Sequence, residues 1–370
     1  MRFSDGTAAS ASLDLAAAGI RGFPPGSGVY APSEGIDIRF LAYEGELPAI
    51  QAATLALDLL LPEGTPVGAA ADLARSVEAQ GSGNQNGSLA DRLSLSLAGF
   101  LCPEVSEAAF EVRPVCLVSL EGEALRSLAE ACMSYGLPLV ALCPEAGIRG
   151  LPPGLLARAG GSVFAIGVKG GKEAIDLLEH GAGAESGPFR LLPLGSGSPL
   201  RFVGKLVHLI VRFLEERRGF SGELYLSVPD RDEEAIAVAL WAWSWGLPLT
   251  GILVPEEMPA PSSVGGHAAA LLARFMEAHP HASLLIRPDC GDFRSGLEGH
   301  GKLFLFGSRS LASGDGEGIA AQGDPDLGAD DPRAGLTLPP DAMVEPGPGQ
   351  LGAVMESIAE KWLRTPPGPL

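Results

Sequence analysis

Between residues 115 and 254, short apolar runs alternate with segments of helical spacing, and this pattern limits the possible folds of the chain. Short runs rich in Val, Leu and Ile are followed by segments with helical spacing, and glycine or proline often closes them. Strands are expected at 115–119, 139–143, 163–168, 223–228 and 250–254, and helices at 123–135, 152–159, 172–180, 200–217 and 233–245. Since parallel strands need a crossover that is usually helical, this order predicts a parallel α/β sheet.

The segments outside this alternation divide the chain further. Helices are expected at 47–60, 268–278 and 351–362, and late strands at 284–286 and 303–306. Residues 62–112 lack a clear period and include a polar loop at 81–88, so we interpret them as an insertion. We predict a small N-terminal subdomain (1–40), a first α/β lobe (41–190, with the insertion at about 62–112) and a second α/β lobe (191–370, with a mobile acidic loop at about 311–348).

The charge balance narrows the range of partners. The chain has 45 acidic and 26 basic side chains, which give a formal net charge of −19. Such a field repels phosphate backbones, so we do not expect a nucleic acid as the partner. Residues 235–255 carry no formal charge, but Gly246-Leu-Pro divides them into a helix and a strand, so no membrane span is predicted.

The cysteines and histidines indicate no metal site. The five cysteines show no metal-ligand spacing, and their odd number is typical of buried free thiols in a reducing compartment. We therefore expect a cytoplasmic location. His279-Pro-His281 has no cluster of carboxylates or cysteines beside it, so no metal ligand is assigned.

Several turns follow one another in an order known from one family of enzymes. Gly28-Val-Tyr-Ala-Pro lies near the N-terminus, Gly136-Leu-Pro precedes a strand, and Val228-Pro is followed at a fixed spacing by a second Gly-Leu-Pro. Together with residues 160–171 and 196–205, these segments resemble threonine synthase, a pyridoxal-phosphate (PLP) enzyme of fold type II. The resemblance covers residues 1–45 and 113–256. It implies a two-lobed α/β fold of parallel or mixed sheets with flanking helices, similar to that of the tryptophan synthase beta chain.

The family's catalytic lysine has no counterpart in this chain. PLP chemistry needs a lysine amine to form a Schiff base. The resemblance places that lysine at Gln51, whose amide cannot form the imine. A shifted alignment would not supply it, because residues 1–168 contain no lysine at all. All five lysines lie further along the chain, at Lys169, Lys172, Lys205, Lys302 and Lys361.

The family's phosphate-binding loop is also replaced. A glycine-rich loop that opens a helix offers backbone N–H groups to a phosphate. In place of the family's Gly-Asn-Phe-Gly, this chain has Arg231-Asp-Glu-Glu, preceded by a further acid; the carboxylates are Asp230, Asp232, Glu233 and Glu234. One arginine does not offset four carboxylates facing a dianion. Acidic residues here are expected to cap the helix at the surface, or to form a site for a cation or an amine.

A third element of the family's active site, the Ser-Gly-Asp-Thr-Gly loop, is altered as well. Its counterpart begins at Glu121, Gly122 and Glu123, so one glycine remains and the hydroxyl donors are absent. Three parts of one active site have therefore changed while the intervening scaffold still resembles the family. We expect no PLP cofactor.

The helix at 200–217 carries the remaining candidate ligand-binding residues. Arg201, Lys205 and His208 are spaced by four and three residues and share one face. They could hold an anion in the inherited cleft, or form a solvated or salt-bridged surface. Ser196 and Ser198 precede the helix and are expected to cap it. The candidate cleft thus comprises Gln51, Ser196, Ser198, Arg201 and Lys205.

Two hypotheses follow for the function. The first is a threonine synthase-like protein without PLP catalysis, which has a binding, regulatory or interaction role. Its partner would be a small molecule or a protein, and the protein could form oligomers. The second is an active lyase that converts O-phosphohomoserine to threonine and phosphate, or another enzyme that uses the same cleft on a small molecule. The absent lysine favours the first.

Overall fold

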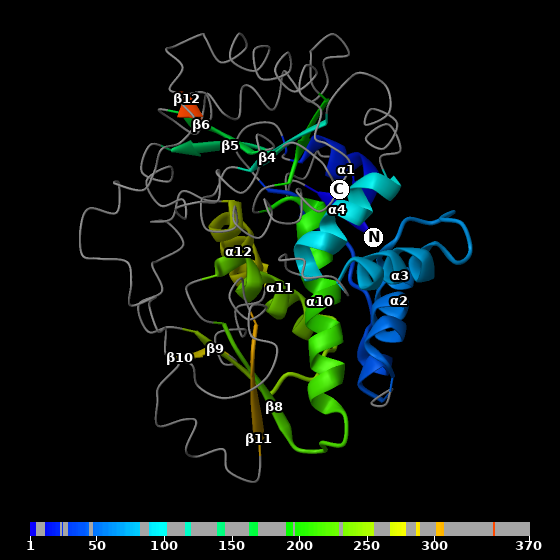
Figure 1. The fold of residues 1–370 in the computed structure, drawn as a ribbon. Helices are drawn as coiled ribbons and strands as arrows, with labels where there is room; N and C mark the ends of the chain where they lie inside the picture. The colour runs from blue at the N-terminus through cyan, green and yellow to red at the C-terminus, as the bar shows by residue number, and fades with distance from the viewer. Residues whose placement is uncertain are drawn as a thin grey trace, which may run out of the picture.

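In the computed structural model, the described residues of the chain form three sheets with helices packed between and beside them (Figure 1). The structure describes residues 1–4, 12–22, 24, 29–43, 47–81, 89–101, 115–119, 139–144, 163–168, 190–194, 197–228, 232–254, 267–278, 286–288, 301–306 and 343–344. The helices predicted at 123–135, 152–159, 172–180 and 351–362, and nearly all of the 311–348 loop, lie outside these residues.

The two larger sheets are parallel throughout. The first has the order β12 (Met343–Val344), β6 (Val163–Val168), β5 (Leu139–Pro144), β4 (Val115–Ser119) and β7 (Arg190–Pro193). The second has the order β10 (Ile286–Pro288), β9 (Gly251–Val254), β8 (Glu223–Ser227) and β11 (Gly301–Leu305). The predicted parallel α/β arrangement is therefore confirmed. Strand β12 returns from far along the chain to the edge of the first sheet, so that sheet contains strands from both sides of the boundary expected at 190.

A small antiparallel sheet contains the N-terminal residues. β1 (Arg2–Ser4) lies between β2 (Leu13–Asp14) and β3 (Ala31–Pro32). Helix α1 (Leu15–Arg21) follows β2 directly, and the Asp14 carboxylate caps it by accepting a hydrogen bond from the Ala17 N–H at 2.7 Å. A 3-10 helix (Arg39–Tyr43) then leads toward α2.

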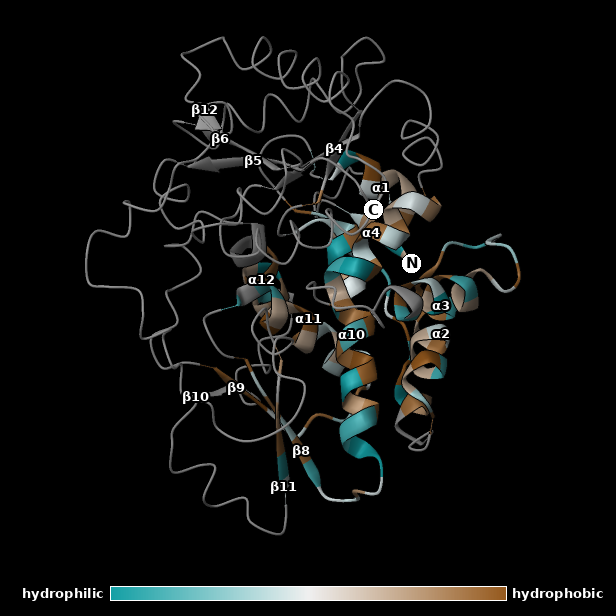
Figure 2. Cartoon of the chain, viewed as in Figure 1, coloured by the Kyte–Doolittle hydropathy of each residue, from teal (hydrophilic) through white to brown (hydrophobic). Residues whose placement is uncertain are grey.

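A long central helix, α10 (Pro199–Arg217), organises the described core. Helices α2 (Ala49–Leu60), α3 (Ala69–Gly81) and α4 (Leu89–Leu101) lie to one side of it, and α11 (Glu233–Ser244) and α12 (His267–Ala278) to the other (Figure 1). Brown apolar positions and teal polar ones follow one another along α10 (Figure 2), although every residue from Pro199 to Val211 is buried. The helix therefore places charged side chains inside the protein.

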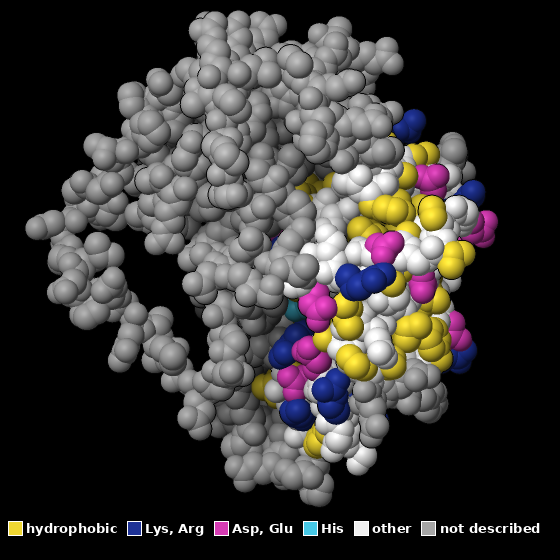
Figure 3. Space-filling view, turned by 45° about the vertical axis from the view of Figure 1, so that its right-hand side comes forward, with side chains coloured by type: hydrophobic (Ala, Val, Ile, Leu, Met, Phe, Trp, Pro, Cys, Tyr) yellow, Lys and Arg dark blue, Asp and Glu magenta, His cyan; other side chains and the backbone are white. Residues whose placement is uncertain are grey.

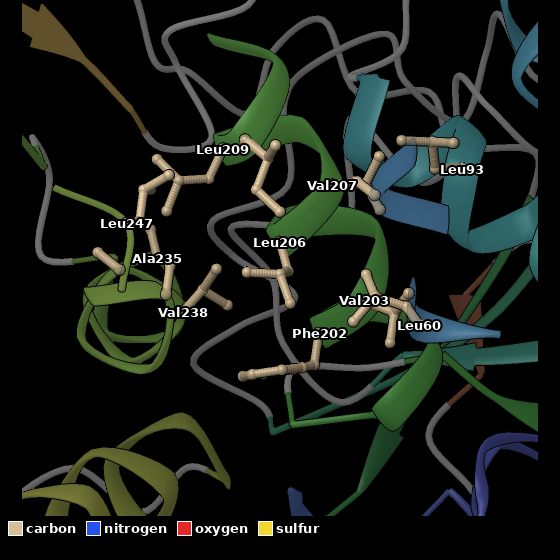
Figure 4. Packing of buried hydrophobic residues seen from close by; sticks show 14 of the residues in the cluster. Leu60, Leu93, Phe202, Val203, Leu206, Val207, Leu209, Ala235, Val238 and Leu247 are labelled. Atoms are coloured by element: carbon tan, nitrogen blue, oxygen red, sulfur yellow. The ribbon is translucent and has the colours of Figure 1, made fainter. Parts of the chain in front are cut away.

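Apolar residues of α10 pack in both directions. Phe202, Leu206 and Leu209 extend toward α11 and the chain that follows it, where Val238 and Leu247 are buried (Figure 4). On the opposite face, Val203 meets Leu60 of α2 and Val207 meets Leu93 of α4 (Figure 4). Complete burial of an aliphatic side chain contributes about 1.5–3 kcal/mol, so this packing stabilises the described core substantially.

Residues 69–81 and 89–101, which were expected to be irregular, are helical, so the predicted irregularity is wrong there; that residues 62–112 are an insertion stays a prediction. They form α3 and α4, and α4 packs closely along α10. At the crossing, a Cβ added to Gly204 would lie only 2.5 Å from the Ala90 carbonyl oxygen, so glycine is required for the approach. The hydropathy pattern did not reveal α4, because the residues that meet Gly204 of α10, Ala90 and Ser94, are small and only weakly apolar or polar. Within the described residues, no helix is long and apolar enough to cross a membrane.

Candidate functional site

Among the described residues, five charged side chains gather where α10 lies beside the first turns of α11 and α4. Arg201 and Lys205 lie one turn apart on α10, Asp232 and Glu234 belong to the start of α11, and Asp91 lies in the first turn of α4. Helical spacing puts the two cations on one face, as the sequence predicted, and the strand–loop–helix connection after β8 brings the two carboxylates to them.

The contacts within this cluster are short. Lys205 Nζ donates to both carboxylate oxygens of Asp232, at 2.9 and 3.1 Å, and lies 2.7 Å from Glu234 Oε2. Arg201 Nε is 3.0 Å from the same Glu234 oxygen, and Arg201 Nη2 is 3.9 Å from Asp91 Oδ1. Glu234 Oε1 accepts a hydrogen bond from the Gly197 backbone N–H at 3.1 Å. Glu234 is therefore the residue that joins α11 to both cations and to the turn before α10.

The cluster is withdrawn from water. The side chains of Arg201, Asp91 and Glu234 are 3–4% exposed, and those of Lys205 and Asp232 are 7% and 11% exposed. Three carboxylates face two cations within this group. An isolated buried charge costs several kcal/mol, so these groups are stable only as a set.

The titration of the cluster reflects this pairing. Burial by itself lowers the pKa of Lys205, but attraction by Asp232 and Glu234 outweighs it and raises the pKa above the usual value. Burial likewise raises the pKa of Asp232, yet Lys205 and the hydrogen bonds that Asp232 accepts lower it overall. Stability from Asp232 is thus present above its unfolded-state pKa near 4 and is lost as the pH falls through the depressed folded value. Stability from Lys205 is lost only when the pH rises above about 10.5.

Asp232 also caps α11. Its Oδ1 accepts a hydrogen bond from the Ala235 N–H at 2.9 Å. The predicted capping role is confirmed for Asp232. The predicted surface position is wrong for Asp232 and Glu234, because their side chains are only 11% and 3% exposed. The cap and the ion pair share Asp232 Oδ1, which has enough lone pairs to accept from both the Ala235 N–H and Lys205 Nζ.

His208, the third member of the predicted trio, does not join the cluster. Its ring is buried against Phe306, with 5.4 Å between ring centroids. Burial, followed by the positive charges of Arg212, Lys205 and Arg92, lowers the pKa of His208 to about 3. His208 is therefore a neutral core residue at physiological pH.

The remaining predicted site residues are dispersed or lie outside the described chain. Gln51 is exposed in the first turn of α2, whereas Arg201 is buried in α10. Ser198 precedes α10 and is buried, but it makes no side-chain cap, so that prediction is wrong. The positions outside the described residues are Ser196, Asp230, Arg231, Glu121, Gly122 and Glu123, and the side chain of Glu233 is not described either.

Ion pairs that are partly open to water form a contrasting set. Arg212 lies 3.0 Å from Glu215 and 2.9 Å from Glu216, and Lys302 lies 2.7 Å from Glu216. On the exposed face of the described region, basic and acidic side chains lie beside one another, with apolar side chains grouped nearby (Figure 3). Such solvated pairs contribute about 0–1 kcal/mol each.

One hollow of about 600 Å³ lies away from the charged cluster. It opens at the amino ends of β8 and β9, between Arg217, Glu223 and Thr250. The Arg217 guanidinium is engaged there, because its Nη1 donates to the Gly222 carbonyl at 2.7 Å. Ligands of parallel sheets bind at the opposite, carboxyl end of the strands, where α11 begins. No group of His, Cys, Asp and Glu in the described part of the chain is arranged to hold a metal ion.

Comparison with known proteins identifies the fold. No protein-family model matches the sequence, and no curated protein matches it significantly. Among solved structures, threonine synthase from Escherichia coli superposes with a TM-score of 0.60 at 14% identity, over 83% of this chain and 88% of that one. Threonine synthase from yeast gives a TM-score of 0.51 at 10% identity, over 83% and 76% of the two chains. The chain has the threonine synthase fold.

The sequence resemblance makes the start of α11 the place to test whether the described residues fit a phosphate group. The positions that resemble the family's phosphate loop carry Asp232 and Glu234, and their oxygens already accept from Lys205 and the Gly197 N–H. A phosphate there would face two buried carboxylates and would find these donors engaged. The residues at the start of α11 therefore do not fit a phosphate group.

Proposed function

We propose that this chain is a threonine synthase-like protein that does not perform PLP catalysis and has a binding, regulatory or interaction role instead. The observation that carries the proposal is the buried Glu234 carboxylate, which lies 2.7 Å from Lys205 and 3.0 Å from Arg201 at the start of α11. Repulsion between this carboxylate and a phosphate dianion, in surroundings with little water to screen it, disfavours the cofactor.

The lysines support the same proposal. No lysine occurs in residues 1–168, and the resemblance places Gln51 at the Schiff-base position. Lys205 is paired with two carboxylates, and its raised pKa keeps the amine protonated, whereas a nucleophilic amine must be neutral. Lys302 lies on β11 and pairs with Glu216. Neither of the two described lysines is thus prepared for imine formation.

The partner that we propose is a small molecule or another protein chain. The net charge of −19 disfavours nucleic acid, as argued from the sequence. A scaffold that keeps its core while its catalytic positions change can present a surface or a remodelled cleft to a partner. A cytoplasmic location and self-association are consistent with this role.

The experiment is a PLP titration of the purified protein. We expect no Schiff-base absorbance band, and after borohydride reduction only substoichiometric labelling spread over exposed lysines such as Lys302. A stoichiometric adduct at one lysine, abolished when that lysine is replaced by alanine, would contradict the proposal. Phosphate release from O-phosphohomoserine in the presence of PLP would establish the alternative, an active lyase.

A further inference from the structure

The donors around Glu234 have the composition of an oxyanion site. The Gly197 N–H donates to Oε1 at 3.1 Å, while Lys205 Nζ and Arg201 Nε lie 2.7 and 3.0 Å from Oε2. Gly197 has a φ of 81°, a left-handed conformation that favours glycine and that sets the direction of its N–H. Two cations and a backbone N–H around one carboxylate are the groups that bind phosphate and sulfate elsewhere in proteins.

Every one of these donors belongs to α10 or to the turn before it, and the anion comes from a different element. Glu234 is supplied by α11, 37 residues after Gly197 in the chain. Ser198 follows Gly197 in the chain, and its buried hydroxyl has no hydrogen-bond partner among the described residues. The start of α10 therefore provides the donors, and the first turn of α11 provides the carboxylate that they bind.

We propose that the start of α10 is an oxyanion site that the protein occupies with its own side chain, the carboxylate of Glu234, with Asp232 bound to the same lysine. The intramolecular carboxylate excludes free anions, and its removal opens the site to inorganic phosphate. This inference goes beyond the proposed function, because it concerns a site on α10 and requires no statement about catalysis.

Charge arithmetic within the cluster explains the selectivity of the site. Among the described side chains, three carboxylates (Asp91, Asp232 and Glu234) oppose two cations, and this excess of negative charge repels an incoming anion. Replacing Glu234 alone leaves two carboxylates and two cations. Replacing Asp232 as well leaves only Asp91 against Arg201 and Lys205, and the sign of the site then favours an anion.

The test uses the double variant Asp232→Ser, Glu234→Ala. Serine keeps an oxygen that caps α11 while it removes the charge, and alanine removes both the charge and the volume of the glutamate. The controls are Asp232→Ser alone, which keeps the internal anion, and Glu234→Gln, which keeps its shape and therefore leaves no room for a phosphate. The probe is inorganic phosphate, compared with chloride at matched ionic strength.

We expect the double variant to bind phosphate at least tenfold more tightly than the natural protein, by calorimetry. Its Tm should rise by about 2 °C more in phosphate, at ten times the Kd, than in matched chloride. The natural protein and both controls should respond to phosphate and to chloride alike. The proposal is overturned if the double variant shows no phosphate-specific response, or if the natural protein binds phosphate equally well.

A double variant that is unfolded at ordinary salt tests the proposal equally well. Refolding is then followed in rising phosphate and in matched chloride, because an anion that fills the site must restore the fold. Equal refolding in the two salts, or none in either, would refute the inference. A stoichiometric PLP adduct would contradict the proposed function without affecting this one, so the two failures are distinguishable.

Discussion

Replacing Lys205 by methionine tests whether the buried cluster holds α10 and α11 together. The lysine is 2.7 Å from Glu234 and 2.9 Å from Asp232, in surroundings where their side chains are 3% and 11% exposed. Its loss leaves one cation, Arg201, and three carboxylates among the described members of the cluster. Removing one partner of a buried pair costs about 3–5 kcal/mol, because the remaining charges stay buried without compensation. We expect a loss of that size in the free energy of unfolding, measured by urea denaturation at pH 7.

The matched control is the same exchange at Lys302. Lys302 also lies 2.7 Å from a glutamate, Glu216, but 44% of its side chain is exposed. Water solvates both partners once the pair is broken, so Lys302→Met should cost about 0–1 kcal/mol. The lysine Nζ lies 2.7 Å from a glutamate oxygen in both pairs. A difference in the loss of unfolding free energy between the two variants therefore measures the effect of burial. Equal losses in the two variants would refute the argument that the cluster depends on its enclosure.

Two further predictions concern α10. The pKa of His208 is about 3 in the folded protein and near 6.5 when unfolded, so stability should fall by about 2 kcal/mol between pH 7 and pH 5. In His208→Phe, the free energy of unfolding measured with urea should fall much less between pH 7 and pH 5. If it falls as much as in the natural protein, groups other than His208 cause the decline. Gly204→Ala should lower the Tm by several degrees, because its Cβ would meet the Ala90 carbonyl, whereas Gly99→Ala, which meets nothing within 4 Å, should not lower it. Equal effects of the two alanines would contradict the close crossing.

The parallel sheets could be predicted because their strands have a clear sequence pattern. Val115–Ser119 and Val163–Val168 are apolar runs bounded by turns, and the structure has strands over the same residues. Helices 69–81 and 89–101 escaped prediction for the opposite reason. Their buried faces include alanine and serine, which have little hydropathy contrast, and their place beside α10 is decided by the fit at Gly204.

The sequence predicted the cations and the carboxylates of the cluster separately, but not their contact. The spacing of Arg201 and Lys205 indicated a shared helical face. The acidic residues within 230–234 indicated a helix start that repels phosphate. That the two groups neutralise each other depends on where α11 lies against α10, which no local pattern specifies. Asp91 was missed altogether, because it belongs to a segment that looked irregular and its partner lies 110 residues away in the sequence.

Helix α10 has a consequence for how the molecule opens. It packs against α1, α2 and α4 on one side and against α11 on the other, and thirteen consecutive residues, from Pro199 to Val211, are buried. Neither group of helices can separate without exposing that apolar surface and the charges beside it. The described core should therefore unfold in a single cooperative step, and the amide hydrogens of α10 should exchange with solvent only at the rate of global unfolding.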